Sequence, residues 1–324
     1  MTAMNRITAN RIAAITCLLL LVVVVGCRRK KITRTDTPTS GVAVLVSDGC
    51  YGNITQEEID VFEALNQKAF LLPIYTSEKE AVDLLLNDSV RLAILARDLT
   101  EAEKQSIKAR NRQLVPRSQK IGVDGIAIIV HKNNPDSLIS LEALKKVMTG
   151  EVSTWRQLNP SSPLGEILVV FDHPTSSTVY FISDSVCGSE PLATDRLHAL
   201  NNNQAVLDYV IQTPSALGII GVNWISNPHD STQLSFNSRI RVMAVSRAHP
   251  ATAASSYKPY PAYLYLRSYP LTRDVYLVLT DLRGTLLSGF THFVASDRGQ
   301  RIILKSGLVP ATKPIRTVQL KEHF

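Results

Sequence analysis

The sequence contains few cysteines for its length. Only four of its 324 residues are cysteine, and two of these, Cys17 and Cys27, lie in the amino-terminal segment considered below. Cys50 and Cys187 therefore remain in the body of the chain, which is too few for a disulfide scaffold. The sequence leaves two alternatives for this pair, a single disulfide in an oxidising compartment or two unpaired thiols.

The usual sequence patterns of catalysis and of cofactor binding are also missing. There is no glycine pattern of a Walker loop or of a dinucleotide site, and the histidines are scattered without the spacing of metal ligands. A hydrolase needs a nucleophile beside a base, but Ser47 has no Gly-x-Ser-x-Gly context and His173 is only a sequence neighbour of Ser176. We therefore expect a protein that is not an enzyme and that carries no cofactor or metal.

The positive charge is concentrated at the amino terminus. Of the net charge of +7, Arg6 and Arg11 contribute two, and the cluster at 28–36 contributes four after Asp36 is subtracted, which leaves about +1 for the rest of the chain. The basic pI thus describes a tether and not a nucleic-acid surface. Basic residues beside a membrane anchor favour anionic headgroups.

The first 26 residues are typical of an export signal. Two arginines precede an apolar stretch at 13–25, which is short for a membrane span and ends in Val-Val-Gly before Cys27. This ending resembles a bacterial lipobox and implies cleavage before Cys27 and lipid attachment to its sulfur, with an uncleaved signal anchor as the alternative. Residues 27–40 are expected to form a basic, flexible tether. The body is thus expected in the cell envelope, on a membrane and facing the periplasm, although the sequence does not say which membrane.

The body after residue 40 alternates between apolar runs and helical periodicity. Such alternation predicts an α/β fold with mixed sheets and helices on both faces. The expected strands are 42–46, 69–75, 91–95, 125–131, 167–171, 217–221, 239–245 and 276–280. The expected helices are 56–67, 81–86, 100–110, 140–148, 176–185, 203–212 and 287–296, the last with a pattern that continues to residue 304.

Four polar loops follow predicted strands. They are Ser47–Gly52, Tyr75–Glu78, Ala96–Thr100 and Asp172–Thr178. Ligands of open α/β sheets lie beyond the carboxyl ends of the strands. Because these loops are rich in hydroxyl groups and contain an arginine, we expect a cleft for a small anion.

Most of the candidate ligand-binding side chains in the first three loops have a second interpretation. Arg97 can neutralise an anion or form an ion pair with Asp98 or Glu101. Ser77 can donate to a ligand or cap the helix that follows it, within the capping-box pattern Ser-Glu-Lys-Glu. Asp48, followed by Gly49, can accept a proton from a protonated anion or bind the N–H groups of its own turn.

The run from Asp172 to Thr178 contains the fourth group of candidates. An apolar strand ends at Asp172, and Ser176, Ser177 and Thr178 stand where a helix begins. Backbone N–H groups at a helix start have no intrahelical partner and carry partial positive charge. The hydroxyls can therefore simply cap the helix or, together with those N–H groups, hold a small oxyanion.

Several scaffold segments resemble the periplasmic phosphate-binding proteins of ABC transporters, in that family's order. The similar segments are Val123–Val130 with Asn134-Pro135, Leu141–Trp155 with its Thr-Gly-x-x-x-x-Trp pattern, Thr213–Gly218, Tyr269-Pro270-Leu271-Thr272-Arg273, Gly299-Gln300 and Gly307–Pro310. The chain also resembles the lipoprotein branch of this family found in Bacteroidetes-type bacteria.

The resemblance implies a two-lobed fold of the type II periplasmic-binding-protein class with a central cleft. Residues 41–124 and 236–324 would form one lobe and residues 125–235 the other. It implies non-catalytic capture of phosphate or a related oxyanion for an ABC permease by a monomeric lipoprotein. The implied ligand-binding residues are Ser47, Asp48, Gly49, Ser77, Arg97, Asp172, Ser176, Ser177 and Thr178.

The loops depart from the family pattern more than the scaffold does. Asp172 stands where the family has an arginine, and Ser177 replaces a glycine that lets backbone approach the phosphate. The acidic side chains of Asp48, Glu78 and Asp172 disfavour a multiply charged anion, which leaves Arg97 as the evident cation of the four loops. An alternative function is therefore a membrane-tethered interaction or signalling module that kept the fold and lost phosphate binding.

Overall fold

The computed structural model describes residues 36–111, 114–188, 190–227, 230 and 235–312. The predicted signal, Cys27 and most of the predicted tether lie outside these residues. Within the described ranges, no helix is long and apolar enough to cross a membrane.

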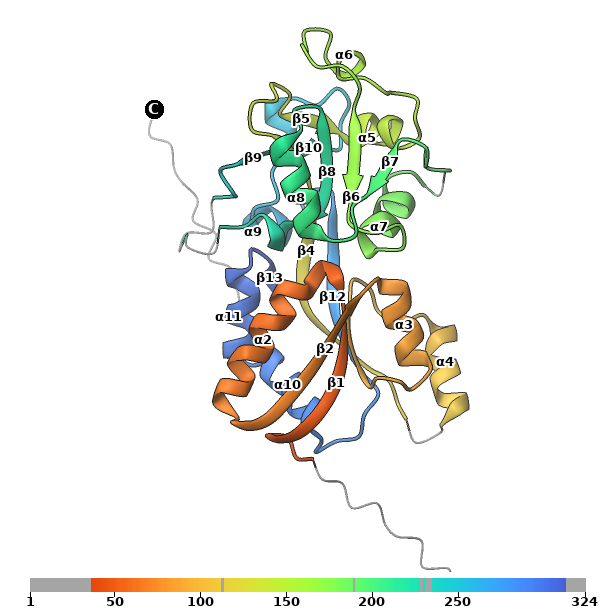
Figure 1. Ribbon diagram of the computed structural model, residues 1–324, viewed down its shortest axis with the longest axis vertical. Helices are drawn as coiled ribbons and strands as arrows, with labels where there is room; N and C mark the ends of the chain where they lie inside the picture. Colours follow the sequence, from red (N-terminus) through yellow and green to blue (C-terminus); the bar gives the residue numbers. More distant parts are fainter. Residues whose placement is uncertain (1–35, 112–113, 189, 228–229, 231–234, 313–324) are drawn as a thin grey trace, which may run out of the picture. The chain divides into compact units, whose positions relative to one another are not determined.

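The order of elements alternates between strands and helices, as Figure 1 shows. The strands are β1 (Ser40–Asp48), β2 (Lys68–Thr76), β3 (Leu92–Leu95), β4 (Arg117–His131), β5 (Leu138–Ser140), β6 (Leu168–Phe171), β7 (Leu197–Ala199), β8 (Ala216–Gly221), β9 (Ile240–Val242), β10 (Ala244–Ser246), β11 (Ser256–Tyr257), β12 (Thr272–Leu279) and β13 (Val309–Pro310). The helices are α2 (Gly52–Leu65), α3 (Glu78–Leu86), α4 (Glu101–Arg110), α5 (Leu141–Met148), α6 (Trp155–Leu158), α7 (Ser177–Ser185), α8 (Asn203–Gln212), α9 (Pro261–Tyr265), α10 (Leu286–Ala295) and α11 (Asp297–Lys305), with short 3-10 turns η1 (Gly49–Tyr51), η2 (Val222–Trp224) and η3 (Ala253–Ser255).

One long strand, β4, joins the two halves of the main sheet. The strand order is β2-β1-β3-β12-β4-β8-β6-β7, and β13 and β9 also pair with β4. Residues 117–125 of β4 pair with β12, whereas residues 126–130 pair with β8. We call the strands on the β12 side of β4 the first half of the sheet and those on the β8 side the second half.

Helices cover both faces of the first half. One apolar core includes Phe62 of α2 and Phe290 of α10, packed edge to face at 5.4 Å between ring centroids. A second core on the other face joins Val82 and Leu85 of α3 to the buried strand residues Val46 and Leu95. The apolar side chains of these central strands are buried on both sides, which explains their nearly continuous hydrophobic runs.

The α/β class with mixed sheets and helices on both faces is confirmed. Six of the seven predicted helices start within three residues of the observed ones; at two of these starts Ser77 accepts from Glu80 N, and Thr100 forms a full capping box with Glu103. Helix α2 begins four residues before its predicted start, and the pattern predicted to continue to residue 304 is two helices, α10 and α11. The main miss is β4, which begins eight residues before the predicted strand because its first residues, Arg117–Lys120, are polar and only half-buried. The predicted strand 239–245 is two short strands, β9 and β10.

Tyr269 is fully buried, and its hydroxyl donates a hydrogen bond of 2.7 Å to the carbonyl oxygen of Ile126 in β4. We expect Tyr269→Phe to lower the free energy of unfolding by about 1–2 kcal/mol, because the buried carbonyl loses its partner. Urea denaturation followed by circular dichroism measures this. Tyr263→Phe is the control, since Tyr263 is more exposed, and an equal loss in both variants would contradict the prediction.

Candidate functional site

The first loop of the site is a tight turn at the end of β1. The Oδ1 atom of Asp48 accepts a hydrogen bond from the backbone N–H of Cys50 at 3.0 Å, which closes the turn that becomes η1. Asp48 therefore binds the N–H of its own turn, one of the two roles that the sequence allows. Its carboxyl group is nevertheless almost fully buried, and its Oδ2 atom has no hydrogen-bond partner among the described residues.

A buried ion pair lies where β4 passes from one half of the sheet to the other. Arg273 of β12 and Asp124 of β4 are direct cross-strand partners. The Nε and Nη2 atoms of Arg273 lie 3.0 and 2.9 Å from Asp124 Oδ2, and both side chains are almost inaccessible to solvent. The guanidinium also lies over the ring of Tyr51, 5.2 Å from its centroid, in a cation–π geometry.

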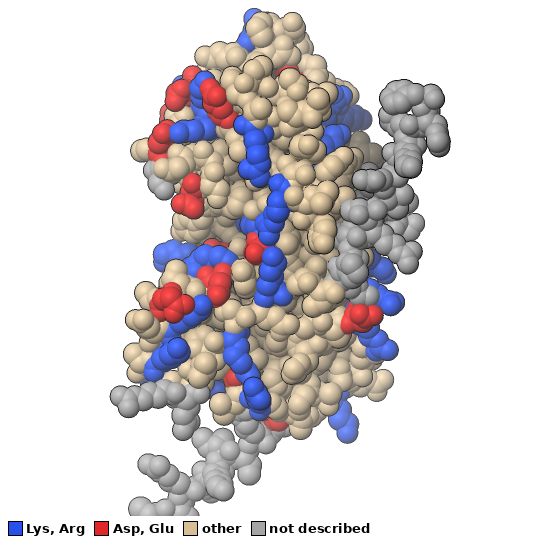
Figure 2. Space-filling model, turned by 180° about the vertical axis from the view of Figure 1, so that it is seen from behind, with Lys and Arg blue, Asp and Glu red and all other residues tan. Residues whose placement is uncertain are grey.

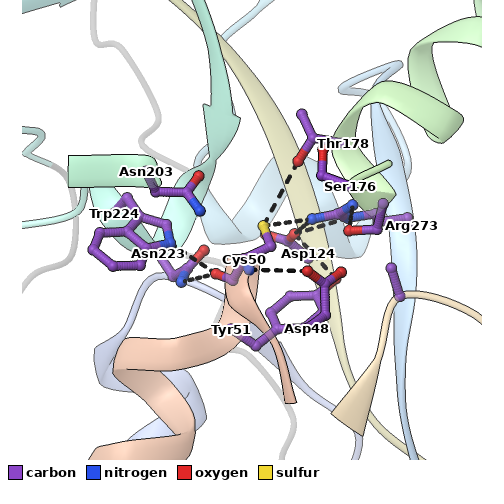
Figure 3. A network of polar contacts seen from close by, with 12 residues as sticks. Asp48, Cys50, Tyr51, Asp124, Ser176, Thr178, Asn203, Asn223, Trp224 and Arg273 are labelled. Carbon is purple, nitrogen blue, oxygen red and sulfur yellow. Dashed lines mark hydrogen bonds and ion pairs between the residues drawn. The ribbon is translucent and has the colours of Figure 1, made fainter. Parts of the chain in front are cut away.

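The same guanidinium connects two loops that are distant in sequence (Figure 3). Its Nη1 atom donates to Ser177 Oγ at 2.8 Å, and its Nη2 atom donates to Cys50 Sγ. Ser177 is the first residue of α7, and Ser176 caps that helix by accepting from Val179 N. Arg273 is therefore placed at a helix start, where backbone N–H groups and positive charge favour an anion.

The Cys50 side chain is enclosed by groups from both halves of the sheet. Thr178 Oγ1 approaches its sulfur at 3.9 Å, and its carbonyl oxygen accepts from Asn223 and from Trp224 Nε1, at 2.9 and 2.7 Å. A Cβ on Gly221 would lie 2.7 Å from the Cys50 sulfur, so only glycine fits there. Burial raises the pKa of the Cys50 thiol, which stays neutral.

Both cysteines of the described chain, Cys50 and Cys187, are buried and unbridged. Of the two alternatives left by the sequence, the structure therefore has the unpaired thiols.

The site presents more hydrogen-bond acceptors than donors. Among the described residues, one carboxylate oxygen each of Asp48, Asp124 and Asp172 is buried without a partner, as are the side-chain oxygens of Asn203 and Asn223. Burial, together with the nearby charge of Glu78, raises the pKa of Asp48 to about 7, although Arg273 opposes the shift. Buried acceptors of this kind require donors, which a protonated ligand or water can supply.

Two cavities flank the Arg273 cluster. A cavity of about 560 Å³ is lined by Arg273, Ser177 and Arg97, among others. A second cavity of about 480 Å³ is lined by five further predicted residues, namely Asp48, Gly49, Ser77, Asp172 and Ser176. The two remaining predicted residues, Ser47 and Thr178, are fully buried. The Ser47 hydroxyl is within 2.8 Å of Thr55 Oγ1 in α2.

The predicted cation, Arg97, is engaged in ion pairs. Its two terminal nitrogens donate to the two carboxylate oxygens of Glu103, both at 2.9 Å, and its Nε atom lies 3.4 Å from Glu78. The sequence therefore named the right kind of alternative, an ion pair, with the wrong partners. Residue-level reasoning missed Arg273, although it ends the Tyr-Pro-Leu-Thr-Arg segment on which the family resemblance partly rests.

No cluster of three or more potential metal ligands exists within the described ranges. With this geometry in view, the chain can be compared with known proteins. Residues 33–298 match the model of the PBP superfamily domain. The chain belongs to the PBP superfamily.

Similar proteins within this superfamily include transport receptors. The phosphate-binding protein PstS of Staphylococcus aureus (strain USA300) is 23% identical over 238 residues, which cover 72% of this chain and 67% of that protein. A substrate-binding protein from Clostridium perfringens, crystallised with bound phosphate, has a TM-score of 0.66 at 19% identity and covers 83% of this chain and 99% of its own. An ABC-type phosphate transport receptor from Vibrio cholerae has a TM-score of 0.62 at 17% identity, covering 83% and 100%. These structures share the fold.

Removing one member of the buried ion pair should lower the free energy of unfolding more than removing both members does. We expect Arg273→Met to reduce the free energy of unfolding by about 3–5 kcal/mol, because the Asp124 charge is left buried and unpaired. The double variant with Asp124→Asn should recover a large part of this loss. Urea denaturation of the two single variants and the double variant measures the coupling, and strictly additive losses would contradict it.

The raised pKa of Asp48 predicts a pH dependence of stability. Since its folded-state pKa is about 7 and the usual value is 3.8, the unfolded chain releases this proton first, and stability is lost as the pH rises from about 4 to 7. The stability of Asp48→Asn relative to wild type should therefore increase across this window, by at most about 1.4 kcal/mol per pH unit. Chemical denaturation at several pH values measures it. The exposed Asp195→Asn is the control, and a flat difference for Asp48→Asn would refute the assignment.

Proposed function

We propose that this protein is a non-catalytic solute-binding protein that captures phosphate or a related small oxyanion for an ABC importer. The observation that carries the proposal is the position of Arg273, a buried guanidinium that contacts Ser177 at the start of α7 and lines a cavity. The names of the similar proteins, which include phosphate-binding and phosphate transport proteins, point to the same ligand class.

The groups around Arg273 fit an oxyanion that still carries hydrogen. The guanidinium and the first turn of α7 supply positive charge and donors. Asp48 and Asp172, which line the second cavity, have unpaired acceptor oxygens that suit a ligand O–H group. We therefore propose that the protonated form of the anion is preferred and that affinity decreases as the anion itself loses this proton.

The two halves of the sheet are proposed to be two lobes that close on the ligand. The sequence predicts that the chain returns from the second lobe to the first between residues 235 and 236. However, β9 pairs with residues 129–131 of β4 and β10 pairs with β5. This pairing favours a crossing after β11, within residues 258–271.

We also propose that the chain is exported and held in the cell envelope by a lipid on Cys27, with an ABC permease as its partner. The apolar stretch and the Val-Val-Gly-Cys ending support this proposal. None of the similar proteins named above is described as an interaction or signalling module, so the alternative function gains no support from them.

Phosphate titration of the purified full chain tests the ligand. We expect calorimetric heat with wild type, a loss of affinity of about 100-fold or more in Arg273→Lys because an ammonium group cannot reproduce the guanidinium's contacts with Asp124, Ser177 and Cys50, and a loss of about fivefold in Ser177→Ala. Arg97→Lys should change affinity by less than about twofold, since Arg97 is occupied by Glu103 and Glu78.

Two outcomes would contradict the proposal. One is no heat and no thermal shift at millimolar phosphate in a folded wild-type chain. The other is a larger loss in Arg97→Lys than in Ser177→Ala, which would place the anion at Arg97 as the sequence first suggested.

A further inference from the structure

A third cavity lies at the other end of the first half of the sheet, away from Asp124. It has a volume of about 400 Å³ and is lined by Arg117 at the start of β4, Arg283 in the loop before α10, and His292 of α10, among others. Gln119, Ser288 and Thr291 add polar side chains to the lining. The proposed oxyanion site does not involve any of these residues.

The lining of this cavity is basic and contains no carboxylate. Arg117 donates to the backbone carbonyl of Asp281 at 2.6 Å, and neither Arg117 nor Arg283 forms an ion pair with the described residues. The carboxylate of Asp281 itself pairs with Arg91 at 3.3 Å. Charge elsewhere is more mixed, since Figure 2 shows both basic and acidic side chains on the rear face. Arginines without carboxylate partners are suited to phosphate groups, which a guanidinium binds with two parallel N–H bonds.

The first described residues of the chain contact α10, the helix that lines this cavity. The Oδ2 atom of Asp36 accepts from the backbone N–H of Leu286 at the start of α10, at 2.9 Å. Pro38 passes so close to the same helix that a Cβ on Gly289 would lie 1.9 Å from its carbonyl oxygen. Cys27 is nine residues before Asp36, so an extended chain between them spans at most about 30 Å. Five basic residues lie in that short stretch.

Exposed apolar side chains lie at the same end of the sheet. Val42 of β1 and its cross-strand partner Phe70 of β2 are 64% and 55% exposed, and Leu72, which pairs with Val44 on the same face, is 53% exposed. Strand β2 is at the edge of the sheet. The registers place the starts of β3 and β4 beside the end of β12, and the start of β1 extends beyond them at the same end of the sheet (Figure 1). Charge attraction and apolar contact are thus available together, as at a membrane surface.

We propose that this end of the sheet rests on an anionic bilayer, with the phosphate of a lipid headgroup bound in the cavity by Arg117 and Arg283. Val42, Phe70 and Leu72 then contact the boundary between headgroups and acyl chains. The inference rests on the membrane anchoring proposed above. It adds a lipid site and a fixed orientation, in which the Arg273 cluster, at the other end of the first half of the sheet, lies away from the bilayer.

Tryptophan quenching in vesicles tests the orientation. The full chain carrying Phe70→Trp is anchored through its own amino-terminal segment in vesicles whose acyl chains are brominated, either neutral phosphatidylcholine or a mixture with anionic phosphatidylglycerol. We expect the fluorescence of the Phe70→Trp variant to be quenched at least about twofold more strongly in the anionic vesicles than in the neutral ones. Tyr180→Trp, an exposed position on α7, should not be quenched in either.

Matched charge variants separate the cavity from a general effect of net charge. Arg117→Ala with Arg283→Ala should abolish the dependence on anionic lipid, and Arg283→Ala alone should weaken it. Arg156→Ala with Arg196→Ala removes the same charge from exposed positions near the second half of the sheet and should leave the dependence unchanged. The wild-type chain in the same vesicles gives the background quenching of the two native tryptophans, Trp155 and Trp224.

Flotation with the vesicles reports anchoring separately, so that a failure of the proposed anchoring is distinguished from a failure of the lipid site. If the chain floats but Phe70→Trp is not quenched, the proposed orientation is wrong. If both pairs of arginine variants reduce the dependence equally, the effect comes from net charge and the cavity is not a lipid site. If millimolar inorganic phosphate abolishes the anionic dependence at constant ionic strength while sulfate does not, the cavity prefers free phosphate to a headgroup.

Discussion

The buried pairing of Arg273 with Asp124 constrains the centre of this molecule more than any other contact. A guanidinium removed from water is tolerated only when nearly all its donors are satisfied. Here the carboxylate of β4, the Ser177 hydroxyl of α7 and the Cys50 sulfur of η1 satisfy them. The positions of both loops thus follow from the requirements of one side chain, and the Tyr51 ring covers one face of the guanidinium.

How well a feature can be predicted from the sequence depends on how far apart in the chain its interacting residues lie. At the helix starts at Ser77, Thr100 and Ser176, the side chain accepts a hydrogen bond from a backbone N–H three residues later. Because this interaction is local, the sequence pattern predicts it. The Arg273–Asp124 pair joins residues 149 positions apart, and no local pattern signals it. The position of Arg97 directly after an apolar strand predicts a ligand-binding cation, yet its guanidinium forms an ion pair with Glu103, six residues later. Arg273 does end a segment that resembles the phosphate-binding family, but that resemblance concerns the scaffold and gives no role to this side chain.

The scaffold and the site are less separate than the sequence suggests. The segments that resemble phosphate-binding proteins include β4, β8 and the start of β12, and these strands contain Asp124, Gly221 and Arg273 or lie against them. The loops contribute Asp48 and Asp172, which make the surroundings of the guanidinium acidic. The fold therefore preserves the cation while the loops alter the charge around it.

The continuity of β4 has a mechanical consequence. A loop between two bodies lets them swivel with little resistance, but β4 passes from one half to the other as an unbroken strand, paired with β12 before Ile126 and with β8 after it. Any rotation of one half against the other must therefore strain the hydrogen bonds of this strand. A continuous paired strand at this joint is therefore stiffer than a flexible loop would be.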